Sequence, residues 1–228
     1  DKPERIDKKW ILPIIIFAAI TVALIVWFFI QNIVKPDIEP ASIEKMAFQL
    51  PDKPSLAVLP FTNMSGDAEQ EYFSDGMTED LITDLSKISG LFVIARNSVF
   101  TYKGKPVKIG QVAEDLGVRY ILEGSVRRSG NQIRVNAQLI DATTGGHLWA
   151  DRYDSQMDNI FALQDGITQK IVSALELKLT DKEKKQTVRH ETDNLEAYDA
   201  FLKGWTHYRK KSKEDAKLAI SYFEKAIN

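Results

Sequence analysis

The residues best placed to bind a ligand form a loop at positions 62–70, TNMSGDAEQ, between an apolar run and a helical pattern. In α/β proteins, ligands commonly bind where a strand ends and the next helix begins. Ser65, Gly66 and Asp67 could present backbone N–H groups to an anion or to a peptide carboxylate. A turn capped by Ser65 or Asp67 explains the same residues, and the lack of a following GK[ST] excludes a P-loop.

Four acidic residues at helical spacing suggest a second chemistry, because paired carboxylates perform general acid–base catalysis in glycosidases. They are Glu71, Asp75, Glu79 and Asp84. Their spacing puts most of them opposite the apolar stripe of the same helix, so we expect a solvated helix face.

Charged and aromatic residues on the later strands allow two readings. Arg127, Arg128 and Arg134 could form a binding patch, although charges at a strand edge more often block aggregation. Trp149 and Tyr153 could stack on a ligand, and we expect them instead to pack beside the core.

Metal and thiol chemistry have little support. The chain has no cysteine, and its three histidines, His147, His190 and His207, are too scattered for a metal-site spacing. No nucleophile and base occur at a recognisable spacing either. We therefore assign no catalytic residue, metal ligand or cofactor to this chain and do not expect it to be an enzyme by itself.

The charge balance argues against nucleic acid as a partner. Lys and Arg number 30 against 32 Asp and Glu, for a formal net charge of −2. A dedicated nucleic-acid binder shows a basic excess or a basic patch.

One stretch near the amino terminus has a length and composition typical of a membrane span. Residues 10–30, WILPIIIFAAITVALIVWFFI, contain no charge, and at about 1.5 Å per residue a helix of this length matches a bilayer core. A buried core helix and a cleaved signal peptide are the alternatives. A core helix would have a polar stripe, and a signal peptide would have a shorter apolar stretch and a cleavage site. We predict a single uncleaved transmembrane helix.

The flanking charges predict its orientation. Four basic residues precede the stretch within residues 1–9, whereas only Lys35 and Lys45 follow it closely. The positive-inside rule places residues 1–9 in the cytoplasm and residues 31–228 outside it. In a bacterium this means the inner membrane, with residues 31–228 in the periplasm.

The remainder divides into a linker, an α/β domain, a hinge and a helical unit. Residues 31–54 contain four prolines and suit a semi-extended linker. Residues 55–179 show the order β-α-β-α-β-β-β-α, in which right-handed crossovers make the first three strands parallel and a meander completes a mixed sheet. Alternation in QIRVNAQLID, after a Gly-Asn turn, predicts one core face and one solvated face. Residues 180–194 are a charged hinge without an apolar stripe.

Residues 195–228 resemble the first unit of a tetratricopeptide array. Gly204 and Tyr208 lie on the first predicted helix, and Ala219, Phe223 and Ala226 on the second. One helical pair cannot bury its own face, so about three repeats are needed. Because the chain begins without Met and stops before the closing proline of the repeat, we expect a fragment. Trp205 and Tyr208 are the residues that we expect to line a peptide groove.

The α/β segment as a whole resembles the TolB amino-terminal-like domain. The similarity runs from LPDKPSLAVLPFTNMSGDAEQEYFSDGMTEDL through GVRYILEGSVRRSGNQIRVNAQLIDATTGGHLWADRYD to IFALQDGITQKIV. It is closest to the version in bacterial receptor-type class III adenylate/guanylate cyclases with carboxyl-terminal tetratricopeptide repeats. Similar modules also follow winged-helix transcription regulators and protein kinases. The resemblance implies a cytoplasmic catalytic domain upstream that uses divalent metals, none of whose ligands lies in this chain.

The resemblance and the residue patterns together leave two classes of function. The first, implied by the resemblance, is the periplasmic sensory and protein-interaction region of a membrane-anchored cyclase. The second is an anchored envelope scaffold, and the periplasmic part of a winged-helix regulator is a further alternative that the resemblance allows. For the first class we expect a homodimer, the membrane, and envelope proteins or peptides bound through the repeats as partners.

Overall fold

The computed structural model describes residues 21, 38–187 and 192–228. Apart from Thr21, these residues belong to one compact unit, Ile38–Asn228. The strands are β1 (Ser55–Val58), β2 (Thr62–Asn63), β3 (Phe92–Val93), β4 (Tyr120–Ser129), β5 (Gln132–Asp141) and β6 (Gly146–Gln156). The α-helices are α2 (Glu71–Ser86), α3 (Arg96–Val99), α4 (Ile109–Leu116), α5 (Ile160–Ala174), α6 (Asp181–Thr187), α7 (Leu195–Arg209) and α8 (Lys213–Ile227). Short 3₁₀ turns are η1 (Ile43–Lys45), η2 (Ala68–Gln70), η3 (Phe100–Tyr102) and η4 (Met157–Asn159).

The strands form one mixed sheet in the order β3-β1-β4-β5-β6, with β2 pairing β4. Strand β1 is parallel to β3 and to β4. Strands β4, β5 and β6 are antiparallel neighbours. The predicted order, with three parallel strands followed by a meander, is therefore confirmed.

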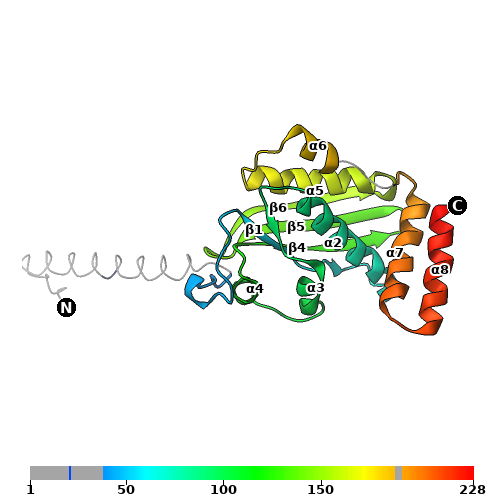
Figure 1. The fold of residues 1–228 in the computed structure, drawn as a ribbon, viewed down its shortest axis with the longest axis horizontal. Coiled ribbons are helices and arrows are strands. Elements are labelled where there is room, and N and C mark those ends of the chain that lie inside the picture. The colour runs from blue at the N-terminus through cyan, green and yellow to red at the C-terminus, as the bar shows by residue number, and fades with distance from the viewer. Residues whose placement is uncertain (1–20, 22–37, 188–191) are drawn as a thin grey trace, which may run out of the picture. The chain divides into compact units, whose positions relative to one another are not determined.

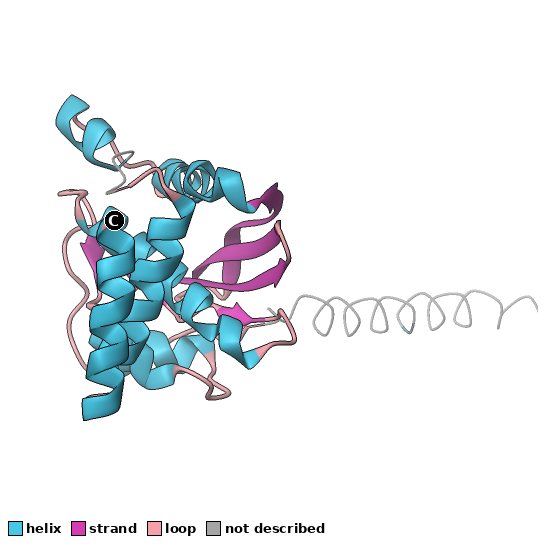
Figure 2. Ribbon diagram, turned by 90° about the vertical axis from the view of Figure 1, so that its right-hand side faces the viewer, coloured by secondary structure: helices cyan, strands magenta, loops and turns pink. Residues whose placement is uncertain are grey.

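The two faces of the sheet follow from the alternation in β5. Ile133, Val135, Ala137 and Leu139 are buried, while the residues between them face solvent. Helices α2 and α5 lie side by side over one face of the sheet, with α7 and α8 beyond α2 (Figure 1). The view from the side shows most of the strands on one flank of this group of helices (Figure 2).

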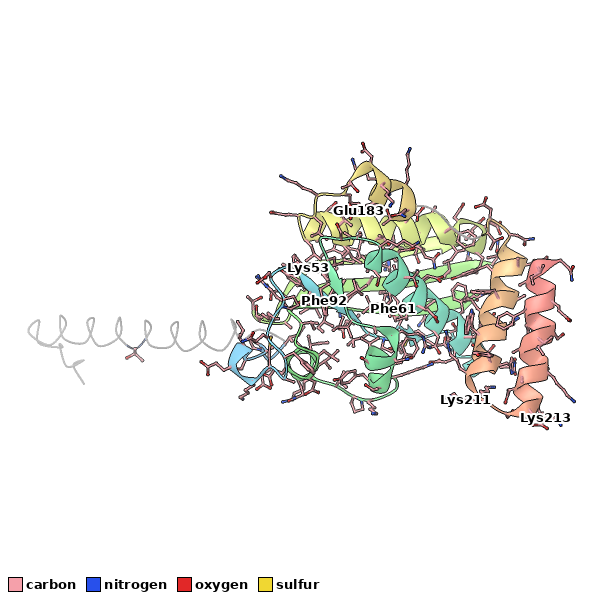
Figure 3. All side chains as sticks on the ribbon, viewed as in Figure 1. Lys53, Phe61, Phe92, Glu183, Lys211 and Lys213 are labelled. Atoms are coloured by element: carbon pink, nitrogen blue, oxygen red, sulfur yellow. The ribbon has the colours of Figure 1, made fainter. Side chains whose placement is uncertain are left out.

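A glycine in β4 allows a large, fully buried side chain to approach the sheet. A Cβ on Gly124 would lie only 2.6 Å from the Phe61 ring and 2.4 Å from the backbone oxygen of Asn136. Phe61 is fully buried, beside α2, and its N–H donates to the Thr78 hydroxyl at 2.9 Å (Figure 3). The glycine therefore fixes the distance between the sheet and α2.

The described part of the predicted linker packs on the domain. The Ala41 N–H donates to the Ala142 oxygen at 2.7 Å, and that of Ala47 to the Glu114 oxygen at 2.8 Å. Ala41 is buried in the main core. Ile38 and Met46 are partly buried against the same core, so this segment is held by apolar contacts as well as by hydrogen bonds.

Part of the predicted hinge is also attached. Helix α6 occupies Asp181–Thr187, and its Glu183 carboxylate accepts hydrogen bonds from the backbone and hydroxyl of Ser89, both at 2.8 Å (Figure 3). Hydrogen bonds from Thr180 and Ser89 lower the pKa of Glu183 to about 2. Residues 188–191 of the predicted hinge lie outside the described residues.

The predicted transmembrane helix must be corrected. Within residues 38–187 and 192–228 and at Thr21, no helix has both the length and the apolarity needed to cross a bilayer. Residues 10–30, on which that prediction relied, lie outside the described residues except for Thr21, as do residues 1–9. An uncharged stretch of the right length permits a span without establishing one.

Alanine substitutions at two glycines should have opposite effects. Gly124→Ala should lower the free energy of unfolding by about 1–3 kcal/mol, because the new methyl group meets Phe61 and a backbone oxygen. Gly166→Ala, inside α5, meets no atom within 4 Å and should raise it by up to about 1 kcal/mol through helix propensity. Urea unfolding of both variants measures the effect, and a neutral Gly124→Ala would contradict the packing described.

Candidate functional site at the junction of the sheet domain and the helical hairpin

The carboxyl-terminal helices pack on the α/β domain through one close contact between α2 and α7. Leu202 on α7 is buried against Gly76 on α2, where an added Cβ would lie 2.5 Å from the Leu202 Cδ2 atom. Tyr198, one turn earlier, is buried in the same core. The absence of a side chain at Gly76 lets the two helices approach closely, so α7 completes the core of the α/β domain.

A polar cluster reinforces this contact on one side. The Tyr72 hydroxyl donates to the Asp199 carboxylate at 2.5 Å, and Arg128 Nη1 lies 3.1 Å from the same oxygen. Lys203 pairs with the second oxygen at 2.8 Å. Burial alone would raise the pKa of Asp199, but hydrogen bonds from Lys203, Tyr72 and Arg128 outweigh it and lower the pKa. The cluster joins α2, α7 and β4.

A second ion cluster lies farther along α7. Arg209 Nη2 contacts both oxygens of Glu79 at 2.7 and 2.5 Å, and Arg96 Nε reaches the same carboxylate at 3.2 Å. The Arg209 guanidinium lies 5.1 Å from the Trp205 ring centroid. These side chains are partly buried, so the pair is better shielded from solvent than an ordinary surface salt bridge.

A carboxylate at the same junction is held by uncharged donors. Asp80 Oδ2 accepts from the Tyr198 hydroxyl at 2.5 Å and from Gln164 Nε2 at 2.9 Å. Burial raises the pKa of Asp80 to about 6 against these two hydrogen bonds, and the negative charges of Asp84 and Glu79 add to the rise. Helices α2, α5 and α7 therefore meet at a titratable group.

A cavity of about 410 Å³ opens beside this group. Its apolar wall contains Phe161, Phe201 and Phe223, and its polar wall contains Asp80 and Gln164. The volume lies in the range of about 300–1,000 Å³ that is usual for small-molecule pockets. The cavity is bounded by both the α/β domain and the hairpin.

The hairpin itself is held by a second close crossing. An added Cβ on Gly204 would lie 2.5 Å from the Phe223 ring, and Phe201 and Trp205 pack around that ring at 6.1 and 5.8 Å between centroids. Both helices are capped, α7 by Asn194 and α8 by the Ser212 hydroxyl, which accepts from the Asp215 N–H. The turn between the helices, near Lys211, lies at the end of the hairpin (Figure 3).

Comparison with known proteins now places the domain. Residues 52–173 match the family model described as the second domain of the HilA/YgeH-like transcriptional regulators. The chain belongs to this family. The matched residues end within α5, so the family domain includes the sheet, α2 and Asp80 but excludes the helical hairpin.

One curated relative is named as a cyclase and not as a transcriptional regulator. The chain is 63% identical over 155 residues to Putative adenylate cyclase 3 of Rhizobium meliloti (strain 1021). The aligned part covers 68% of the chain but only 26% of the relative. A relative that is named as a putative adenylate cyclase thus confirms the resemblance to modules found in cyclases, and only that part of it.

Several solved structures share features of the fold at low similarity. TolB from Acinetobacter baumannii is 18% identical with a TM-score of 0.41, covering 57% of this chain and 30% of that one. Lipoprotein GNA1162 from Neisseria meningitidis is 21% identical with a TM-score of 0.40, covering 55% and 99% of the two chains. TM-scores of this size carry no argument about function.

The predicted ligand loop is a capped turn that is hydrogen-bonded to β4. The Ser65 N–H donates to the Asn63 side chain, and the Ser65 hydroxyl accepts from the Arg128 N–H. Gly66 has a positive φ of 77°, and Asp67 caps η2 by accepting from the Glu69 N–H. The capped turn considered from the sequence is therefore present, and ligand binding there stays a prediction.

The acidic residues on α2 have a structural role that the sequence did not indicate. Glu79 binds α7 and α3, Asp75 pairs with Lys103 at 2.6 Å, and Asp84 pairs with Lys87 at 2.7 Å. The expected solvated face is thus partly a docking face. Sequence reasoning missed Asp80, whose signal was its position one residue before Leu81, on the flank of the apolar stripe.

The predicted aromatic residues divide between packing and exposure. Trp149 and Tyr153 lie 6.3 Å apart and pack against the core, as expected. Trp205 is partly buried in the hairpin, whereas Tyr208 is 59% exposed. Their predicted role in a peptide groove stays a prediction, as does the tetratricopeptide assignment of the hairpin. Within the described residues no group of three or more His, Asp or Glu could hold a metal ion.

A compensating pair of substitutions should test the α2–α7 contact. Gly76→Ala should destabilise the chain by about 1–3 kcal/mol through its clash with Leu202. Leu202→Ala alone should cost about 2–5 kcal/mol by leaving a cavity. The double variant should lose less free energy of unfolding than the two single variants lose together, because the new methyl group at position 76 fills part of that cavity. Additive free energies from urea unfolding would contradict direct packing of these residues.

Titration of Asp80 should make stability fall as the pH rises from 5 to 7. Its folded-state pKa of about 6 lies above the ordinary value of 3.8, so folding takes up a proton in this range. The contribution of Asp80 to the free energy of unfolding is therefore most favourable at low pH and is lost as the pH rises through about 6. Asp80→Asn should reduce the fall in the free energy of unfolding between pH 5 and 7 by about 1 kcal/mol or more. Unfolding of both proteins at pH 5 and 7 checks this, and identical slopes would refute it.

Proposed function

We propose that this chain is the protein-interaction region of a longer bacterial signalling protein with adenylate/guanylate cyclase output. The support is the 63% identity to a relative named as a cyclase, of which the chain spans about a quarter. The proposal assigns no catalytic residue and no metal to this chain. The resemblance to TolB-like domains supports the cell envelope as the place of action, and the implied cyclase domain supports a homodimer.

The observation that carries the proposal is the rigid attachment of the hairpin to α2. Leu202 packs on Gly76, and charged clusters at Glu79 and at Asp199 flank that contact. A force applied to the hairpin therefore reaches α2 and, through Phe61 and Thr78, the sheet. This is the mechanical requirement for a module that relays the binding of a partner.

The hairpin offers exposed apolar side chains to such a partner. They include Tyr208, Leu218 and Ile220, with exposures from 47% to 59%. A tetratricopeptide array stacks further helices on exposed apolar side chains of this kind, and its groove binds peptides. We propose that α7 and α8 begin such an array and that Trp205 and Tyr208 belong to its groove.

The family match favours a second candidate, a module of a transcription regulator. Residues 52–173 match the second domain of HilA/YgeH-like regulators. In that case the same hairpin and domain would relay partner binding to a DNA-binding output. The two candidates differ in the output domain and share the interaction role.

Measuring cyclic nucleotides separates the two candidates. The full-length protein containing this chain should produce cyclic AMP or cyclic GMP in a cyclase-deficient bacterial host. Deleting residues 41–228 should change that output by about fivefold or more, the lower end of typical coupling between sites. Ile220→Glu on the exposed face of α8 should change it in the same direction, while Lys217→Glu, also exposed, should not.

Two results would contradict the proposal. If a stably expressed full-length protein synthesises no cyclic nucleotide, the proposed cyclase output is wrong and the regulator is favoured. If synthesis is normal and the deletion leaves it unchanged, the proposed signalling role of this region is wrong.

A further inference from the structure

The cavity between α2, α5, α7 and α8 combines an aromatic wall with a carboxylate. Four aromatic rings line it, those of Phe161, Tyr198, Phe201 and Phe223. Phe161 and Tyr198 meet edge to face, with centroids 5.1 Å apart. Ring faces and carboxylates both attract a positive charge, so the two walls favour the same kind of ligand.

Among the described residues that line the cavity, one carboxylate has no cationic partner. Asp84 and Lys87 also line it and pair with each other at 2.7 Å. Asp80 has only uncharged partners among the described residues, and both of its hydrogen bonds reach Oδ2. Within residues 38–187 and 192–228 no hydrogen bond reaches Oδ1, and Asp80 lines the cavity. An acceptor is thus available at the cavity wall.

We propose that this cavity binds an organic ammonium cation, with its positive charge at Asp80 and its alkyl groups against the aromatic rings. An anion would meet an uncompensated carboxylate here. A hard metal ion would need several oxygen ligands in place of rings. A quaternary or alkyl-substituted ammonium group satisfies both walls, and aromatic cages with a nearby carboxylate suit such groups. The cavity volume of about 410 Å³ accommodates a small ligand of this class.

The site does not depend on the cyclase proposal, because it requires only the junction between α2, α5 and α7. Occupancy would nevertheless add contacts across that junction, from Asp80 on α2 to Phe201 on α7 and Phe223 on α8. A ligand held by both parts stabilises their attachment by mass action. The cation would therefore tighten the hairpin on the domain.

The test uses the 228-residue chain and choline as the probe. Ligand-observed saturation-transfer NMR should show choline binding. The neutral alcohol in which carbon replaces the quaternary nitrogen of choline should bind about tenfold more weakly or not at all. This comparison needs no variant, so it remains informative whether or not a substitution perturbs folding. Equal binding of the two probes, or no binding of choline, would overturn the proposal.

Two substitutions locate the binding. Asp80→Asn should raise the dissociation constant of choline about tenfold, whereas Glu196→Gln, which removes an exposed carboxylate near Tyr198, should leave it within about twofold. Unchanged binding in Asp80→Asn would overturn the assignment. Glycerophosphocholine then distinguishes the source of the cation. If it binds as well as choline, the ligand is a lipid headgroup. If it does not bind, the ligand is a free amine, and either result keeps the proposed site.

Discussion

The attachment of α7 and α8 to the α/β domain depends on the packing of Leu202 against Gly76. It brings α7 close enough to α2 for Tyr198 to enter the core and for Asp199 and Arg209 to reach their partners. A single helical pair has too little apolar surface to fold alone. Here the pair buries its apolar face on the α/β domain, with α2 as the neighbouring helix.

The same packing explains the unusual chemistry of the junction. Closing α7 over α2 partly shields Asp80 from water while giving it, among the described residues, only the Tyr198 hydroxyl and the Gln164 amide as partners. The carboxylate therefore has a raised pKa and an oxygen free for a further partner, next to aromatic rings from both parts. Attachment and ligand binding at this place are two consequences of one arrangement. A family domain that ends within α5 would lack it, since α7 and α8 contribute half of the cavity wall.

The sheet could be predicted from the sequence because its signals are local. Alternation in β5, the turn at Gly130 and the apolar spacing of α2 each identify an element, and crossover handedness then orders the strands. The junction could not be predicted in this way. Glu79 and Arg209 are 130 residues apart, and Tyr198 and Asp80 are 118 apart. Periodicity identifies the apolar face of α7 but not the surface that covers it, and the uncharged stretch at 10–30 similarly indicated a span that no described helix provides.

Native-state hydrogen exchange of the 228-residue chain most directly tests whether the hairpin and the α/β domain are one cooperative unit. If they are, amides in the middle of α7, around Ala200 and Leu202, should open with the same free energy as those in the middle of α2, and Leu202→Ala should lower both. Exchange of α7 at the rate of an unprotected helical pair, with α2 unaffected by Leu202→Ala, would contradict the account.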